Sequence, residues 1–338
     1  MTGVQTCALP IYIVGDRVRW LNGMVTNDIQ SLQPGEGCYN FVLNAQGRIQ
    51  GDLTAFALPD SLLLETTDAG KLATWFDHYI IMDDVELTVL RNGRGERESA
   101  AAGGYPFLAE ASDRTGVSLV GPRAAAILQS LDFPVGQLPT LRLQCATWNN
   151  ASVDIIHAHS PLVPSIELWS DQATIQKLTS ALLTAGATPV SPSALEALRI
   201  LSGTPRYGVD IRNTDAAHDL PQETGQTRAL HFTKGCYLGQ EIVERIRSRG
   251  SVHRTFHGFS LTGPLPAPGT PLTAESSPRP VGELTSVAAI PLPESAAAPA
   301  RAIQLALGYV RREALDRALT LEYPGGIATP IAMPYPIP

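Results

Sequence analysis

Residues 234–250, KGCYLGQEIVERIRSRG, combine the residue types and spacing best suited to chemistry. Cys236 follows the cation of Lys234 by two residues, and Gly235 between them permits a tight backbone path. A helix beginning near Gly239 would direct its free N–H groups toward the sulfur. These features favour a reactive thiolate. The alternative is a small buried residue at a strand-to-helix turn, because unreactive buried cysteines are common.

The same segment carries a basic edge on an acidic chain. Its cations are Arg245, Arg247 and Arg249, and Arg254 follows. They are suited to an anion site for a polyglutamate tail or an RNA phosphate. The alternative is a solvated face in which Glu244 pairs with one of these arginines.

Cysteine usage bears on metals and on the cellular compartment. Cys7, Cys38, Cys145 and Cys236 form no CxxC pair and have no histidine at metal-ligand spacing. We therefore expect reduced thiols and no permanent metal. The N-terminus lacks the order of a signal peptide, and no apolar run approaches the ~18–20 residues that span a bilayer. These patterns predict a cytoplasmic protein without membrane contact.

Composition and length restrict the class of protein further. A chain of 338 residues predicts two or three domains. Its net charge of −7 argues against general DNA binding, which needs clustered Lys and Arg. Residues 1–11, MTGVQTCALPI, resemble translated sequencing-adapter read-through and are predicted to be a non-native leader.

The predicted helices and strands that must position these residues form two regions of different secondary-structure content. Residues 12–253 predict an α+β body of two subdomains with a boundary near 112–116. Within it we expect a hairpin turn at residues 44–47 and helices at residues 68–80, 171–186 and 191–203. Asp68 and Asp171 are the expected N-caps.

The pattern of predicted secondary structure changes at residue 254. Short strands separated by Pro/Gly-rich loops predict a small β-barrel or sandwich over residues 254–325. The proline-rich residues 326–338 predict a mobile tail.

Residues 234–250 resemble the signature of the YgfZ family, which belongs to the glycine-cleavage T-protein (GcvT) aminomethyltransferase superfamily. Nearly the whole chain after residue 12 supports the resemblance, in family order. The matching segments are LNGMVTNDIQSLQPGEG (21–37), FVLNAQGRIQGDL (41–53), DHYIIMDDVELTVL (77–90), LVGPRAAAIL (119–128), EALRILSGTPRYGVDI (196–211), LPQETG (220–225) and ALGYVRREA (306–314).

The resemblance implies an α+β, multi-domain ring around a central folate pocket, with a C-terminal β-barrel. It implies non-covalent binding of tetrahydrofolate or a derivative. It also implies an accessory role in iron–sulfur cluster assembly or repair, with iron–sulfur client or assembly proteins as partners, and enzymes that modify tRNA among the clients. Cys236 would be the working thiol. The implied or candidate cofactor-binding residues are Asn27, Tyr207, Glu223, Lys234, Gly235, Tyr237, Gly239, Gln240, Glu241 and Arg245.

Two departures from the glycine-cleavage pattern bear on catalysis. The segment GRIQGDL would carry two adjacent acids, and here Gly51 replaces the first and Asp52 remains. An acid expected to grip the pterin edge is replaced by Leu201, which has no hydrogen-bonding group. Asp52 is therefore a candidate catalytic acid or, alternatively, a hairpin acid. Whether the chain is an enzyme stays open at this point.

Two alternatives accompany the accessory role. The first is a folate-dependent one-carbon transferase, which needs a positioned acid near the reacting nitrogen. The second is a non-catalytic structural partner that kept the fold and lost the pocket.

Overall fold

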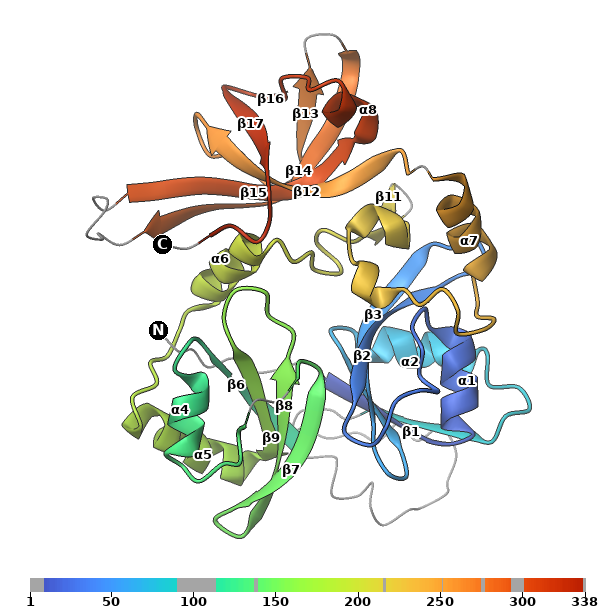
Figure 1. Ribbon diagram of the computed structural model, residues 1–338, viewed down its shortest axis with the longest axis vertical. Coiled ribbons are helices and arrows are strands. Elements are labelled where there is room, and N and C mark those ends of the chain that lie inside the picture. The colour runs from blue at the N-terminus through green and yellow to red at the C-terminus, as the bar shows by residue number, and fades with distance from the viewer. Residues whose placement is uncertain are drawn as a thin grey trace. The chain divides into compact units, whose positions relative to one another are not determined.

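The computed structural model describes residues 9–89, 114–136, 139–214, 217–250, 252–274, 277–292 and 301–336 (Figure 1). The chain divides into two units. Unit 1 comprises Met1–Leu43, Gln50–Ser191 and Arg228–Leu238, and unit 2 comprises Asn44–Ile49, Pro192–Thr227 and Gly239–Pro338.

Unit 1 contains two sheets, and the first has strand order β2-β3-β4-β1-β5. Its strands are β1 (Leu9–Gly15), β2 (Gly37–Leu43), β3 (Ile49–Ala57), β4 (Leu62–Thr66) and β5 (Val85–Val89). Helices α1 (Arg17–Met24) and α2 (Ala69–Asp77) share an apolar core with this sheet. In it the rings of Trp20 and Phe76 pack edge to face, with 5.4 Å between their centroids. Asp68 accepts a hydrogen bond from the backbone N–H of Lys71, which confirms the predicted N-cap.

The second sheet has strand order β6-β9-β8-β7. Its strands are β6 (Arg114–Val120), β7 (Arg142–Trp148), β8 (Ala151–Ala158) and β9 (Ser165–Asp171), and its helices are α4 (Ala124–Gln129) and α5 (Gln172–Thr184). Asp171 caps α5 by accepting from the N–H of Thr174 at 2.9 Å, as predicted.

The two sheets of unit 1 meet through a separate apolar cluster. Its members are Tyr12, Phe56, Leu63, Leu143, Ile156 and Trp169. Because strand side chains alternate between faces, the residues two or four positions along the same strands lie on the same meeting faces. Those residues include Asp52, Glu65 and Glu167, so the junction is apolar at one end and acidic at the other.

Unit 2 contains a closed barrel with strand order β12-β15-β14-β13-β16-β17. Its strands are β12 (Arg254–Thr262), β13 (Thr270–Ala274), β14 (Ser277–Leu292), β15 (Arg301–Arg311), β16 (Glu322–Tyr323) and β17 (Gly326–Ile331). The remaining elements are α6 (Pro192–Ser202), β10 (Asn213–Thr214), β11 (Ala217–His218), η2 (Pro221–Thr224), η3 (Thr227–Ala229), α7 (Gln240–Arg249) and α8 (Arg312–Asp316).

The structure differs from the predicted chain ends at two places. Strand β17 pairs with both β12 and β16 and closes the barrel, so a mobile tail beginning at residue 326 is wrong for Gly326–Ile331. Pro330 lies opposite Phe259 of β12, and the pairing of β17 with β16 covers only Gly326 and Ile327, so proline stands where β17 has one neighbouring strand. Strand β1 begins at Leu9, inside the range predicted as a leader, and the origin of residues 1–11 stays a prediction.

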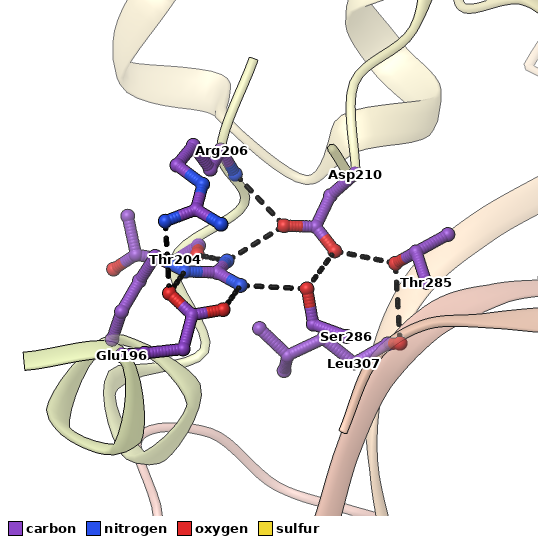
Figure 2. Close-up of polar contacts among 8 residues, drawn as sticks. Glu196, Thr204, Arg206, Asp210, Thr285, Ser286 and Leu307 are labelled. Carbon is purple, nitrogen blue, oxygen red and sulfur yellow. Dashed lines mark hydrogen bonds and ion pairs between the residues drawn. The ribbon is translucent and has the colours of Figure 1, made fainter. Parts of the chain in front are cut away.

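A buried polar network joins α6 to the barrel within unit 2 (Figure 2). Asp210, which is 0% exposed, accepts from Arg199 Nη1 at 2.6 Å and from Ser286 Oγ at 2.7 Å. The Thr285 hydroxyl also donates to Asp210. Arg199 Nη2 donates in turn to Glu196 Oε1 at 2.7 Å and to Ser286 Oγ at 2.6 Å. Each of these polar groups has a hydrogen-bond partner within the network, and a buried charge is tolerated when it is paired in this way.

Candidate functional site

The acidic end of the sheet junction in unit 1 opens into a cavity of about 230 Å³. Its lining includes residues from both sheets and from the segment that leads into the Cys236 motif. The ionisable side chains on it are Tyr39, Asp52, Glu65, His159, Glu167 and Arg228. A concave site with convergent polar groups is the arrangement expected of a small-molecule site.

Asp52 is the best-positioned acid in this cavity. Its Oδ2 accepts a hydrogen bond from the Tyr39 hydroxyl at 2.6 Å, and its backbone carbonyl accepts from the Thr66 hydroxyl at 2.8 Å. Burial raises the pKa of Asp52, although the Tyr39 hydrogen bond and the charge of Arg228 oppose this rise. A carboxyl group shifted in this direction is suited to proton transfer closer to neutral pH.

Asn27 positions the neighbours of Asp52 and does not line the cavity. Its Nδ2 donates to the carbonyl of Tyr39 at 3.0 Å and to that of Arg228 at 2.8 Å. The guanidinium of Arg228 then lies 4.0 Å from the centroid of the Tyr39 ring. Asn27 therefore joins two segments beside the cavity, and its role in cofactor binding stays a prediction.

Gly51 and Asp52 lie on opposite faces of β3, and this decides what the absence of an acid at position 51 implies. A Cβ added at Gly51 would lie 2.6 Å from Leu72 Cδ2, on the face that packs against α2. Asp52 is on the opposite face, in the cavity. An acid at position 51 would thus point into the apolar core. Of the two positions only 52 faces the cavity, and it carries the acid Asp52.

A second acidic pair was missed by sequence reasoning. Glu65 on β4 and Glu167 on β9 lie within hydrogen-bonding contact. Burial, and then the negative charges of Glu167 and Asp52, raises the pKa of Glu65 well above its ordinary value. Tyr39 and Arg228 were missed as well. The available signal was weak: each acid interrupts a strand that is otherwise rich in apolar residues, LLLET and SIELWS.

Lys234 does not direct its charge at the Cys236 thiol. Its ammonium is buried, donates to the backbone carbonyls of Asn22 and, at 2.7 Å, Val25, and lies 4.9 Å from the centroid of the Tyr237 ring. It therefore caps the C-terminal end of α1, where free carbonyls favour a cation. Burial lowers the pKa of Lys234 to about 8.

Replacing Lys234 with methionine should destabilise unit 1 by about 1–3 kcal/mol at neutral pH, because buried carbonyls lose their donor. Between about 8 and the ordinary lysine pKa, the unfolded state binds more protons than the folded state, so this group makes wild-type stability rise with pH. The variant should lack that rise. Chemical denaturation at several pH values measures both effects, with exposed Lys177→Met as the control. Equal losses in the two variants would contradict the capping role.

The rest of the Cys236 motif is divided between the two units. Cys236 is exposed, Gly235 has φ +98°, and Tyr237 is buried. In unit 2, α7 begins at Gln240 after Gly239, whose φ of +83° favours glycine. Roles for these residues, with Gln240, in cofactor binding stay predictions.

The basic edge of α7 is an ion-paired, solvated face. Arg245 Nη2 contacts Glu241 Oε1 at 2.7 Å, and Arg247 Nη1 contacts Glu244 Oε2 at 3.4 Å. All four side chains are at least one-third exposed, so these pairs contribute little to stability. Roles for Glu241 and Arg245 in binding a cofactor stay predictions.

Glu223 and Tyr207 belong to unit 2 and do not line the unit 1 cavity. Glu223 accepts from the N–H of Leu220 at 3.2 Å and pairs with Arg254 Nη2 at 3.1 Å, so its carboxylate is committed to local structure. Tyr207 forms an isolated bridge with Ile211. Leu201 is buried on α6, as its apolar side chain requires.

The other cysteines differ from Cys236. Burial raises the pKa of the Cys38 thiol to about 11, which makes it a poor nucleophile. The exposed Cys145 lies 3.0 Å from the Ser152 hydroxyl. Within the described ranges, no group of three or more His, Cys, Asp or Glu side chains is arranged to hold a metal ion. No helix in the described part of the chain has the length and apolar character to cross a membrane.

The fold defines a class of protein. A crystal structure of the glycine cleavage system aminomethyltransferase T from Bartonella henselae superposes with a TM-score of 0.75 over 99% of this chain and 86% of its own, at 18% identity, which shows the shared fold. The family model for the GCVT N-terminal domain matches residues 9–234. The chain therefore belongs to the GCVT N-terminal domain family.

Several curated proteins are similar to this chain in sequence. An aminomethyltransferase of Herpetosiphon aurantiacus is 26% identical over 253 residues, or 73% of this chain and 63% of its own length. One of Thermus thermophilus is 25% identical over 312 residues, or 90% and 79%. A chloroplastic putative transferase of Arabidopsis thaliana is 23% identical over 277 residues, or 80% and 57%. The chain spans 63–65% of the length of several aminomethyltransferases that it matches.

Proposed function

We propose that this chain binds a reduced folate in the unit 1 cavity and catalyses folate-dependent one-carbon transfer, with Asp52 as the proton-transfer group. The observation that carries the proposal is the partly buried Asp52–Tyr39 hydrogen bond of 2.6 Å on the cavity wall. Membership in the GCVT N-terminal domain family and the aminomethyltransferases among its relatives support it.

The size and lining of the cavity favour the ring end of a folate. Its volume of about 230 Å³ is below the ~300–1,000 Å³ usual for drug-sized ligands, so it suits a bicyclic ring and not the whole molecule with its glutamate tail. Tetrahydrofolate presents several N–H donors on that ring. The carboxyl groups of Asp52, Glu65 and Glu167 are acceptors suited to them.

The transfer itself needs a group that moves protons from the two nucleophiles to the folate nitrogens. In methylenetetrahydrofolate one carbon bridges two folate nitrogens. When an amine and a thiol take that carbon, both carbon–nitrogen bonds to the folate break, and each folate nitrogen gains the proton that one nucleophile loses. No oxidant or reductant is required. Asp52 would accept and return these protons, and the Tyr39 hydroxyl stabilises its ionised form.

An isotope-transfer assay tests this function directly. Wild-type protein, labelled methylenetetrahydrofolate, ammonia and a dithiol are combined, and labelled product and free tetrahydrofolate are measured. We expect both to form together above the rate without protein. Folate binding without any transfer would contradict the catalytic half of the proposal.

An accessory role in iron–sulfur cluster assembly or repair, of the YgfZ type, is the second candidate. The specific observation that favours it is the exposed Cys236, which does not line the cavity. A thiol that acts on a client protein must be accessible to that client. A shared cluster at a partner interface, or sulfur transfer to a tRNA-modifying enzyme, would use such a thiol, in the cytoplasm.

Exchanging Cys236 for serine separates the two candidates. A role on clients predicts at least a tenfold loss in reactivation of an iron–sulfur client, with one-carbon transfer unchanged. Cys145→Ser is the matched control because that thiol is also exposed. Equal client reactivation by both variants and wild type would contradict the accessory role.

A further inference from the structure

The two glutamates in the unit 1 cavity come from different sheets. Glu65 is on β4 and Glu167 is on β9, each two positions from an apolar residue of the sheet junction, Leu63 and Trp169. Their carboxyl groups are in hydrogen-bonding contact with each other. Glu167 Oε2 also accepts from the indole N–H of Trp169 at 3.1 Å.

Glu65 and Glu167 are each partly exposed. Two carboxylates in contact where protein replaces part of the surrounding water cannot both be ionised at low cost, since like charges repel more strongly there. One proton between them removes the repulsion and supplies their hydrogen bond. The proton is assigned to Glu65, whose pKa is raised first by burial and then by Glu167 and Asp52.

A purely structural role gives no reason for this pair. Withdrawing carboxyl groups from water is unfavourable, and apolar residues of similar volume are often as stable in such places. Leu63 and Trp169 already join the same faces by apolar packing. Strongly perturbed acids in a cavity are instead characteristic of functional sites.

The other ionisable groups around Glu65 come from every strand near it. Arg114 is already paired with Asp154 and donates to the carbonyl of Trp169 at 3.2 Å, so its charge is committed. Partial burial and the charge of Arg228 lower the pKa of His159. The full set is Tyr12 on β1, Tyr39 on β2, Asp52 on β3, Arg114 on β6, Asp154 on β8, His159 after β8, Glu167 on β9 and Arg228.

We propose that Glu65 and Glu167 hold one proton between them and recognise two adjacent N–H donors on the edge of a neutral heterocycle. This inference rests on the proposed folate site, where the ring N–H and the neighbouring amino group of the pterin are those donors. After the shared proton is placed, Glu65 keeps one unengaged oxygen, and Glu167 keeps a second lone pair on an oxygen that already accepts a hydrogen bond.

Substituting Glu65 tests the pair because glutamine reproduces its protonated form. Glu65→Gln keeps a donor toward Glu167 and an acceptor for the ligand, and it cannot ionise. Glu65→Leu removes both. The probe is 5-formyltetrahydrofolate, and affinity is measured by calorimetry from about pH 6 to about pH 9.

For wild type we expect affinity to fall as pH rises, because the pair ionises a second time and the carboxylates repel. Glu65→Gln should bind within about threefold of wild type at the low end and lose the pH dependence. Glu65→Leu should bind at least about tenfold more weakly at the low end. His159→Gln removes the other group that titrates in the cavity, and the fall in affinity with rising pH should persist in it.

A second probe separates recognition from structure. A folate analogue without the pterin amino group should bind wild type at least about tenfold more weakly than the parent, and Glu65→Leu should discriminate less. If Glu65→Leu had the same affinity, pH profile and discrimination as wild type, the inference would be overturned. No binding by wild type at any pH would instead overturn the folate site itself, and the role of the pair with it.

The shared proton also has a readout that needs no ligand. Because the pKa of Glu65 is higher in the folded state than in the unfolded state, folding takes up a proton, and wild-type stability should fall as pH rises through that interval. Glu65→Gln should flatten this dependence in chemical denaturation. An unchanged slope would overturn the proton-sharing arrangement.

Discussion

Replacing Asp52 with asparagine should lower one-carbon transfer by about 10²–10⁴-fold, the range that a positioned proton-transfer group contributes. Asparagine is close in volume and keeps an oxygen that can accept from the Tyr39 hydroxyl, now 2.6 Å from Asp52 Oδ2. The cavity should therefore keep its shape, and folate affinity should change by less than about threefold. The expected signature is a loss in kcat with little change in binding.

The pH profile gives this prediction a second readout. Burial raises the pKa of Asp52, and its carboxylate is the form that accepts a proton. Wild-type kcat/KM should therefore rise with pH through an acid limb above the range of an exposed aspartate. The residual activity of Asp52→Asn should lack that limb. Asp60→Asn, at an exposed aspartate, is the matched control and should behave as wild type. Full activity in Asp52→Asn would refute the catalytic role.

Replacing Asp210 with alanine should destabilise unit 2 by about 3–5 kcal/mol, the cost of removing one partner of a buried ion pair. The substitution leaves Arg199, whose side chain is 13% exposed, without the oxygen that it contacts at 2.6 Å. It also removes the acceptor for the hydroxyls of Thr285 and Ser286 (Figure 2). Each buried group left without a partner adds to the cost.

Chemical denaturation followed by circular dichroism measures this loss. Removing both charges, in Arg199→Met with Asp210→Leu, should recover a large part of it, because no unpaired charge remains. Arg317→Ala breaks the exposed pair with Glu313, at 3.2 Å, and should cost less than about 1 kcal/mol. Similar losses in Asp210→Ala and Arg317→Ala would contradict the role given to the network.

Features set by local sequence were predictable. Asp68 and Asp171 cap their helices because each accepts from an N–H three residues ahead. The turn at residues 44–47 closes as expected, with Gly47 N–H donating to the Asn44 carbonyl at 2.9 Å. Short strands and Pro/Gly loops after residue 254 predicted a small barrel or sandwich, and the family resemblance implied the barrel that is observed. The prolines of residues 326–338 led to the prediction of a mobile tail in place of β17.

The cavity was less predictable because its walls come from distant segments. Glu65 and Glu167 are about one hundred residues apart in sequence, and only the meeting of two sheets brings them together. Lys234 has the spacing of an activating cation, but its long side chain reaches the carbonyls at the end of α1. The significance of Gly51 was misjudged for a simpler reason, since alternation along β3 already directs residues 51 and 52 to opposite faces.

The central claim is that the unit 1 cavity binds a reduced folate, and equilibrium calorimetry under anaerobic, reducing conditions tests it most directly. Tetrahydrofolate is titrated into wild type, Cys236→Ala, Ala158→Trp, which fills the cavity from its wall, and Ala151→Trp at the other end of β8 as the control. We predict saturable one-to-one binding by wild type, Cys236→Ala and Ala151→Trp, and none by Ala158→Trp. Equal binding by all four proteins, or none by folded wild type, would contradict the claim.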